Sequence, residues 1–235
     1  MRPRGMWIPN NHYPLIRWVF LLVSCLPLAT LVYGFLDNQL APNSFARLSH
    51  TLGHTALVFL VLALAVTPLR RWAIFFFRFT PFKWGKRLAD WNFLVRLRRS
   101  IGLLAFVYMT LHIYTYLYLE LGFDWHEFVY EITTRQFLLP ALAASIIMTI
   151  LAITSANYFR RTLGRWWRRL HRLIYILSIL AVLHYYMFAK VTDKLPIVYA
   201  LVVGILLLHR LVLAAFKSLG RTDDTGMEAT REDKR

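Results

Sequence analysis

Long apolar segments alternate along the chain with shorter polar or basic ones. Six segments are apolar for roughly the 20 residues that a helix needs to cross the hydrocarbon core of a bilayer. They cover residues 15–35, 51–69, 101–121, 137–156, 173–189 and 196–216. Apolar runs of this length differ from the apolar stripes of soluble amphipathic helices. The pattern therefore predicts an all-α polytopic membrane protein, a bundle of six transmembrane helices over residues 15–216.

Short polar segments flank this predicted membrane domain. Residues 1–14 form a leader without a small-residue cleavage site after the first apolar segment, so we expect the first span to remain as an anchor. Residues 217–235 are polar and mixed in charge, a composition typical of a disordered tail. The lone cysteine, Cys25, excludes an intramolecular disulfide and a thiolate cluster.

The positive charges are distributed unevenly among the connections between spans. The net charge is +16, and 58% of the residues are hydrophobic. The basic residues after span two are Arg70, Arg71, Arg78, Lys83, Lys86, Arg87, Arg96, Arg98 and Arg99, and those after span four are Arg160, Arg161, Arg165, Arg168, Arg169 and Arg172. The connections after spans one, three and five contain only Arg47, Arg135, and Lys190 with Lys194.

This asymmetry predicts that both termini and the arginine-rich connections face the cytoplasm, an N-in/C-in topology. It also argues against a nucleic-acid footprint and favours contact of the basic loops with anionic membrane lipid. We therefore expect no nucleic-acid partner and a multi-pass location in a bacterial inner membrane.

Histidine carries the functional signal, because an ionisable side chain inside a span is costly and usually has a role. His112 lies within span three and His184 within span five. His171 lies where span five leaves the cytoplasm, and His50 and His54 lie at the outer end of span two. We expect no role for the remaining three, His12, His126 and His209.

His112 and His184 lie at similar predicted depths. Counted from the cytoplasmic boundary at about 1.5 Å per residue, they are about 16 and 21 Å into the membrane. Helix tilts of about 20° absorb that difference. Two neutral imidazoles from separate helices at one level can ligate a haem iron from both faces. The sequence predicts a b-type haem between spans three and five, the alternative being that each histidine only hydrogen-bonds to a neighbouring helix.

His171 is too far along span five to share that iron, since about 20 Å separates it from His184. The position in span three that would face it contains Arg99, next to Arg98, rather than a histidine. His171 therefore either ligates a second haem with an unidentified partner or positions a flavin or quinone. His50 and His54, one turn apart on one helix face, remain alternative ligands for a haem near the outer surface.

Four sequence runs, in this order, resemble one known family. They are LSHTLGHTAL at 48–57, VTPLR at 66–70, RRSIGL at 98–103 before Leu111-His112, and LGRWWRRLHRLIY at 163–175 before His184-Tyr185. Together they resemble the MsrQ family, formerly called YedZ, within the ferric-reductase-like transmembrane superfamily. The resemblance covers about residues 15–216.

The resemblance implies a six-helix, b-haem, electron-transfer subunit rather than the catalytic subunit of an oxidoreductase. It would pass electrons from the quinone pool or a cytosolic flavin reductase to MsrP, a periplasmic molybdenum-cofactor enzyme that reduces methionine sulfoxide in envelope proteins. The haem histidines of the family correspond to His112, His171 and His184. One or two haems, and the presence of flavin mononucleotide (FMN), both remain open.

Two other functions compete with this one. A stand-alone transmembrane reductase would deliver electrons to external ferric or cupric ions, but the predicted outer acidic residues are sparse for a metal-ion site, which favours a protein acceptor. Those residues are Asp37, Asp124, Glu127, Glu131 and Asp193. In a haem-free transporter or scaffold, the histidines would instead relay protons or form hydrogen bonds.

Overall fold

The structure is a computed structural model that describes residues 13–37, 44–81 and 91–232. Most of the predicted leader lies outside the described residues. So does the middle of the first basic loop, which contains Lys83, Lys86 and Arg87.

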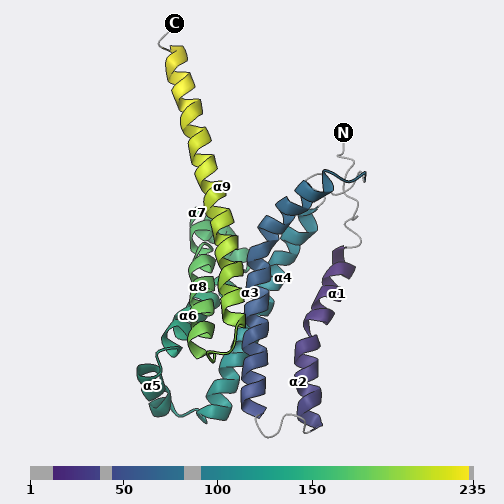
Figure 1. The fold of residues 1–235 in the computed structure, drawn as a ribbon, viewed down its shortest axis with the longest axis vertical. Helices are drawn as coiled ribbons and strands as arrows, with labels where there is room; N and C mark the ends of the chain where they lie inside the picture. The colour runs from purple at the N-terminus through teal and green to yellow at the C-terminus, as the bar shows by residue number, and fades with distance from the viewer. Residues whose placement is uncertain (1–12, 38–43, 82–90, 233–235) are drawn as a thin grey trace.

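The described chain is mostly helical and contains no strand, so the prediction of an all-α polytopic membrane protein is confirmed (Figure 1). The helices are α1 (Tyr13–Ser24), α2 (Leu26–Leu36), α3 (Ser44–Phe77), α4 (Asn92–Thr115), the π-helix η2 (Tyr116–Glu120), α5 (Trp125–Thr134), α6 (Leu138–Ile153), α7 (Asn157–Leu170), α8 (Leu173–Phe188) and α9 (Leu195–Glu232).

Each of the six predicted spans corresponds to a helix or to a pair of helices. Among the described residues, four helical stretches are long and apolar enough to cross a bilayer: Tyr13–Gly34, Phe45–Phe77, Asn92–Glu120 and Leu195–Ala215. The other two, α6 and α8, have 16 residues each, so each is about 24 Å long, somewhat short of a hydrocarbon core about 30 Å thick. They reach the required length only with the preceding helices, α5 and α7, which are bent from them by 114° and 54°.

The first span is interrupted between α1 and α2 at Cys25. Pro27 lacks an N–H group and cannot donate to the carbonyl four residues before it, so the helix is weakened at this point. The hydroxyl of Tyr108 in α4 donates to the carbonyl of Ser24 at 2.5 Å. This bond ties the interrupted span to the centre of the bundle.

The core lies mainly between α3 and α4, which form the most extensive helix pair. Leu60 and Ala63 of α3 belong to one buried cluster with Ile101 and Ala105 of α4. Most other large apolar side chains remain exposed, as expected for helices whose outer faces contact lipid. The α3–α4 pair therefore forms a rigid support for residues on its flanks.

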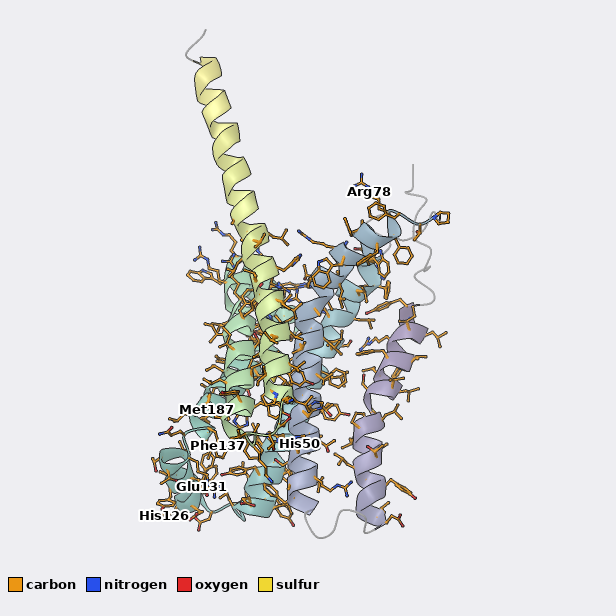
Figure 2. All side chains as sticks on the ribbon, in the orientation of Figure 1. His50, Arg78, His126, Glu131, Phe137 and Met187 are labelled. Carbon is orange, nitrogen blue, oxygen red and sulfur yellow. The ribbon has the colours of Figure 1, made fainter. Side chains whose placement is uncertain are left out.

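The two ends of the bundle differ in chemistry. In Figure 1, α1 begins and α9 ends at the same end, as an even number of passes requires. Figure 2 shows Arg78 at this end and His126 and Glu131 at the other. We call the first the arginine-rich end, because its helix ends and connections contain Arg70, Arg98, Arg99, Arg168, Arg169 and Arg172. We call the second the α5 end. Assignment of the arginine-rich end to the cytoplasm remains the prediction of the positive-inside rule.

Helix α9 continues as far as Glu232 and so enters the segment for which composition predicts disorder. The division of the chain into leader, membrane domain and tail stays a prediction.

Candidate functional site

The rings of His112 in α4 and His184 in α8 lie side by side between their helices. Their centroids are 6.4 Å apart and their planes are inclined by 62°. Both side chains are partly buried, and both belong to segments expected to span the membrane. The structure thus brings together the two histidines that the depth count placed at similar levels.

Backbone carbonyl groups fix the protonation of both rings. Nδ1 of His112 lies 2.9 Å from the carbonyl oxygen of Ser49, and Nδ1 of His184 lies 2.9 Å from that of Phe137. A carbonyl oxygen can only accept, so each Nδ1 must carry the proton and each Nε2 has a free lone pair. Neither Nε2 has a hydrogen-bonding partner among the described residues. This tautomer is the one in which imidazole binds a metal through Nε2.

Helix α3 also positions His112 by close approach of its backbone. A Cβ atom on Gly53 would lie 3.1 Å from Cε1 and 3.2 Å from Nδ1 of the His112 ring. Ser49, whose carbonyl oxygen accepts the hydrogen bond from Nδ1 of His112, lies one turn before Gly53 on the same face of α3. The absence of a side chain at Gly53 therefore lets the ring lie against the helix and reach that carbonyl.

Two aromatic side chains pack beside His184, and the α-helix α4 becomes a π-helix just after His112. The ring centroids of Phe137 and Phe188 lie 6.0 and 6.4 Å from that of His184. After Thr115, α4 continues as the π-helix η2, a local widening that is often found at functional sites. Figure 2 places Phe137 and His50 in the half of the bundle nearer the α5 end.

His50 and His54 stack on each other on α3, with centroids 6.1 Å apart and planes within 7°. The hydroxyl of Tyr199 lies 2.9 Å from Nε2 of His54, and the ring of Tyr185 lies beside His50. Neither histidine has a facing histidine like that of the central pair. Within the described ranges, no three histidine, cysteine or acidic side chains are grouped closely enough to hold a metal ion.

His171 lies apart from the pair, at the junction of α7 and α8 near the arginine-rich end. Its Nε2 is 3.3 Å from the hydroxyl oxygen of Thr154, and its ring packs on Trp167 with centroids 4.1 Å apart. Trp167 in turn donates from Nε1 to the carbonyl of Thr154 at 3.0 Å. Burial lowers the pKa of His171, although a hydrogen bond at Thr154 opposes this shift.

The spacing of the central pair fits a single metal between the rings. Two imidazole nitrogens, each about 2 Å from one iron, would place their ring centroids roughly 6 to 6.5 Å apart. The observed separation of 6.4 Å falls in this range. The fold and these two rings therefore define a helical membrane protein with a pair of adjacent histidines between two of its helices.

Comparison with known proteins identifies the family. Residues 72–182 match the family described as "Ferric reductase like transmembrane component". Three relatives are each named "Protein-methionine-sulfoxide reductase heme-binding subunit MsrQ". The protein of Herminiimonas arsenicoxydans is 34% identical, covering 85% of this chain and 86% of its own. That of Rhodospirillum rubrum is 35% identical over 83% and 88%, and that of Azospira oryzae is 36% identical over 84% and 78%. The chain belongs to the MsrQ family.

Sequence reasoning missed the residues that orient His112 and His184. Ser49 and Phe137 act through backbone carbonyls, which no side-chain pattern reveals, and Gly53 acts by lacking a side chain. Arg210 was also missed, although a charged residue inside the apolar run of span six was a readable signal.

Proposed function

We propose that this chain holds a b-type haem through His112 and His184 and carries electrons across the bacterial inner membrane to a methionine sulfoxide reductase. The relatives are named as haem-binding subunits of such a reductase, which supports this assignment. The predicted inner-membrane location is in line with the family and with the apolar helices of the structure.

One observation carries the proposal. Two Nε2 atoms from different helices are free of hydrogen bonds, and their rings have the separation that one shared iron requires. A pair of histidines that served only to join helices would be expected to spend both nitrogens on protein partners. Here only Nδ1 of each ring makes a hydrogen bond, and its partner is a backbone carbonyl. The two histidines are not hydrogen-bonded to each other.

The chain's own residues hold and orient the ligand nitrogens. The carbonyl groups of Ser49 and Phe137 keep the proton on Nδ1, which makes each Nε2 a stronger electron donor. Gly53 holds the His112 ring against α3. A haem iron bound by two imidazoles would supply one-electron transfer between its ferric and ferrous states.

The direction of transfer follows from the charge distribution. The arginine-rich end faces the cytoplasm in the N-in/C-in topology, so a cytosolic flavin reductase would deliver electrons there, while quinones would reach the bundle from the lipid. The bis-histidine site is nearer the α5 end, which would face the periplasmic reductase MsrP. FMN and a second haem at His171 are further parts of this proposal.

The experiment is an absorption spectrum of the purified full-length chain, with haem quantified per chain. We expect a Soret band that sharpens and shifts on reduction, as six-coordinate b-type haem does. In a second step, the reduced protein is mixed with purified MsrP and a methionine-sulfoxide peptide, and reoxidation of the haem is followed. Reoxidation should require both components, and MsrP without substrate is the control. A chain that folds but contains no haem would contradict the proposal.

A further inference from the structure

A buried carboxylate lies between α5 and the end of the helix that contains His112. Glu131 of α5 is almost completely buried, and its Oε2 accepts a hydrogen bond from the Tyr116 hydroxyl at 2.6 Å. Its Oε1 pairs with Nη2 of Arg135 at 2.6 Å. A charged group that is removed from water is costly unless it is paired and hydrogen-bonded. The two partners therefore hold the Glu131 carboxylate in one position.

Tyr116 connects this carboxylate to His112. The backbone N–H of Tyr116 donates to the carbonyl of His112, and η2 begins at Tyr116. The two residues are one helical turn apart, so their side chains leave the helix on the same side. Through the Tyr116 hydroxyl, the helix that contains His112 is tied to Glu131 of α5.

Arg135 connects the same carboxylate to the carbonyl that orients His184. The N–H of Arg135 donates to the carbonyl of Glu131 at 2.8 Å, and the Arg135 carbonyl accepts from the N–H of Leu138 at 3.0 Å. The second bond closes a tight turn between α5 and α6, and Phe137 lies inside this turn. The carbonyl oxygen of Phe137 is the one that lies 2.9 Å from Nδ1 of His184. Movement of Arg135 would therefore move that carbonyl.

These contacts form one continuous connection between the two central histidines, and Figure 2 shows Glu131 and Phe137 in the same part of the bundle. The connection runs through His112, Tyr116, Glu131, Arg135, Phe137 and His184. Its members come from α4 with η2, from α5 with the turn that follows it, and from α8. Partners in the outer shell of a ligand fix the orientation of its ring and raise its basicity.

We propose that Glu131 is a positioning residue for the central histidine pair. Together with Tyr116 and Arg135, it holds the Phe137 carbonyl on Nδ1 of His184 and fixes the distance between the two imidazoles. This inference rests on the proposed haem function and adds to it the residues that set the potential of the central haem. A well-aligned bond to Nδ1 makes Nε2 a stronger electron donor, which stabilises ferric iron. Loss of any member of the connection therefore raises the midpoint potential.

The test is a redox titration of the full-length, haem-loaded chain and of variants that each lack one member of the connection. Tyr116→Phe, Glu131→Gln and Arg135→Gln should each raise the midpoint potential of the central haem. The same variants should bind this haem about tenfold more weakly, as measured by its transfer to an excess of apomyoglobin. Arg135→Lys keeps a cation that can pair with Glu131, so it should bring the potential back towards the wild-type value.

The signs of these shifts separate positioning from a simple effect of charge. Ferric haem carries one more positive charge than ferrous haem. Loss of the negative charge of Glu131 would therefore raise the potential, and loss of the positive charge of Arg135 would lower it. Positioning predicts an increase in both variants. It also predicts an increase in Tyr116→Phe, which changes no charge.

Two control variants match these changes. Glu127→Gln removes an exposed carboxylate one turn before Glu131 on the same helix, and it should leave the potential at the wild-type value. Tyr175→Phe removes the hydroxyl that accepts from Arg210 at 2.7 Å near the arginine-rich end. This change should lower the thermal unfolding midpoint but leave the potential of the central haem unchanged, because Tyr175 does not belong to the connection.

Several results would overturn the inference. They include wild-type potentials in folded Tyr116→Phe and Glu131→Gln chains, opposite shifts for Glu131→Gln and Arg135→Gln, or an equal shift in Tyr175→Phe. If Glu131→Gln does not fold, Arg135→Gln decides, because the Arg135 side chain is 46% exposed and its loss leaves little unfilled space. A wild-type chain that holds haem while its variants do not respond would refute this inference alone. A wild-type chain that contains no haem would refute the proposed function itself.

Discussion

Gly53 of α3 lies directly against the imidazole of His112, so that a Cβ atom added to Gly53 would be 3.1 Å from Cε1 of the ring. Overpacking of this kind typically lowers the free energy of unfolding by about 1–3 kcal/mol and displaces neighbouring side chains. We expect Gly53→Ala to shift the haem absorption and electron paramagnetic resonance (EPR) spectra, and Gly53→Leu to cause loss of the central haem. Gly102→Ala is the control, because nothing lies within 4 Å of its added Cβ. A Gly53→Leu protein with a wild-type spectrum would contradict this role.

Replacement of either central histidine would remove one of the two proposed axial ligands. His112→Ala and His184→Ala should each lose the haem nearer the α5 end, as measured by haem per chain and by loss of its low-spin EPR signal. His126→Ala changes an exposed histidine of α5 and should leave both measurements at the wild-type level. Full haem content in either of the central variants would exclude the assigned ligand pair.

Much of this architecture was predictable because lipid imposes length and polarity on each span. Counting residues along spans three and five placed His112 and His184 at similar depth, and the structure places their rings together. Depth counts carry no information about rotation around a helix axis. The contacts of His112 with Ser49 and Gly53, and of Arg210 with Tyr175, depend on that rotation and on helix pairing, so they required coordinates.

The bend before α6 could not be predicted from the hydropathy pattern either. Asp124 caps α5 by accepting from the backbone N–H groups of His126 and Glu127, and α5 then lies at 114° to α6 rather than extending it. A hydropathy pattern gives the apolar length of a segment but not its direction. The sixteen-residue length of α6 follows from this turn and not from its composition.

A buried carboxylate anchors α5 to the end of the third span. Glu131 is only 6% exposed, accepts from the Tyr116 hydroxyl at 2.6 Å, and pairs with Arg135 at 2.6 Å. Tyr116→Phe removes a donor from this carboxylate, which should destabilise the protein by about 1–3 kcal/mol. The measurement is the thermal unfolding midpoint in detergent, compared with Tyr118→Phe, where the side chain is 54% exposed. Equal midpoints for the two variants would show that the bond adds no stability.

Membrane orientation is tested by reporters at the two ends of the bundle. A reporter fused after residue 235 should give the signal of a cytoplasmic location. A reporter inserted near Trp125 should give the signal of a periplasmic location. The reason is the concentration of arginines at the end opposite α5. The reverse pattern would place the bis-histidine site near the cytoplasm and would reverse the proposed direction of electron transfer.

His171 provides the sharpest distinction between one haem and two. It lies about 20 Å from His184 along the chain, too far for both imidazoles to bind one iron at about 2 Å. If His171 ligates a second haem, His171→Ala should lose about half of the bound haem and retain the low-spin signal of the His112–His184 pair. If it instead positions a flavin or quinone, haem content should stay at the wild-type level and only reduction by the physiological donor should slow.

Thr154→Val removes the hydroxyl that lies 3.3 Å from Nε2 of His171. This variant distinguishes the two roles, because a His171 that binds iron through Nε2 does not need that hydroxyl, whereas a His171 held by the hydrogen bond does. Loss of all haem from a folded His171→Ala protein would contradict both roles and would require a single haem bound in a different geometry.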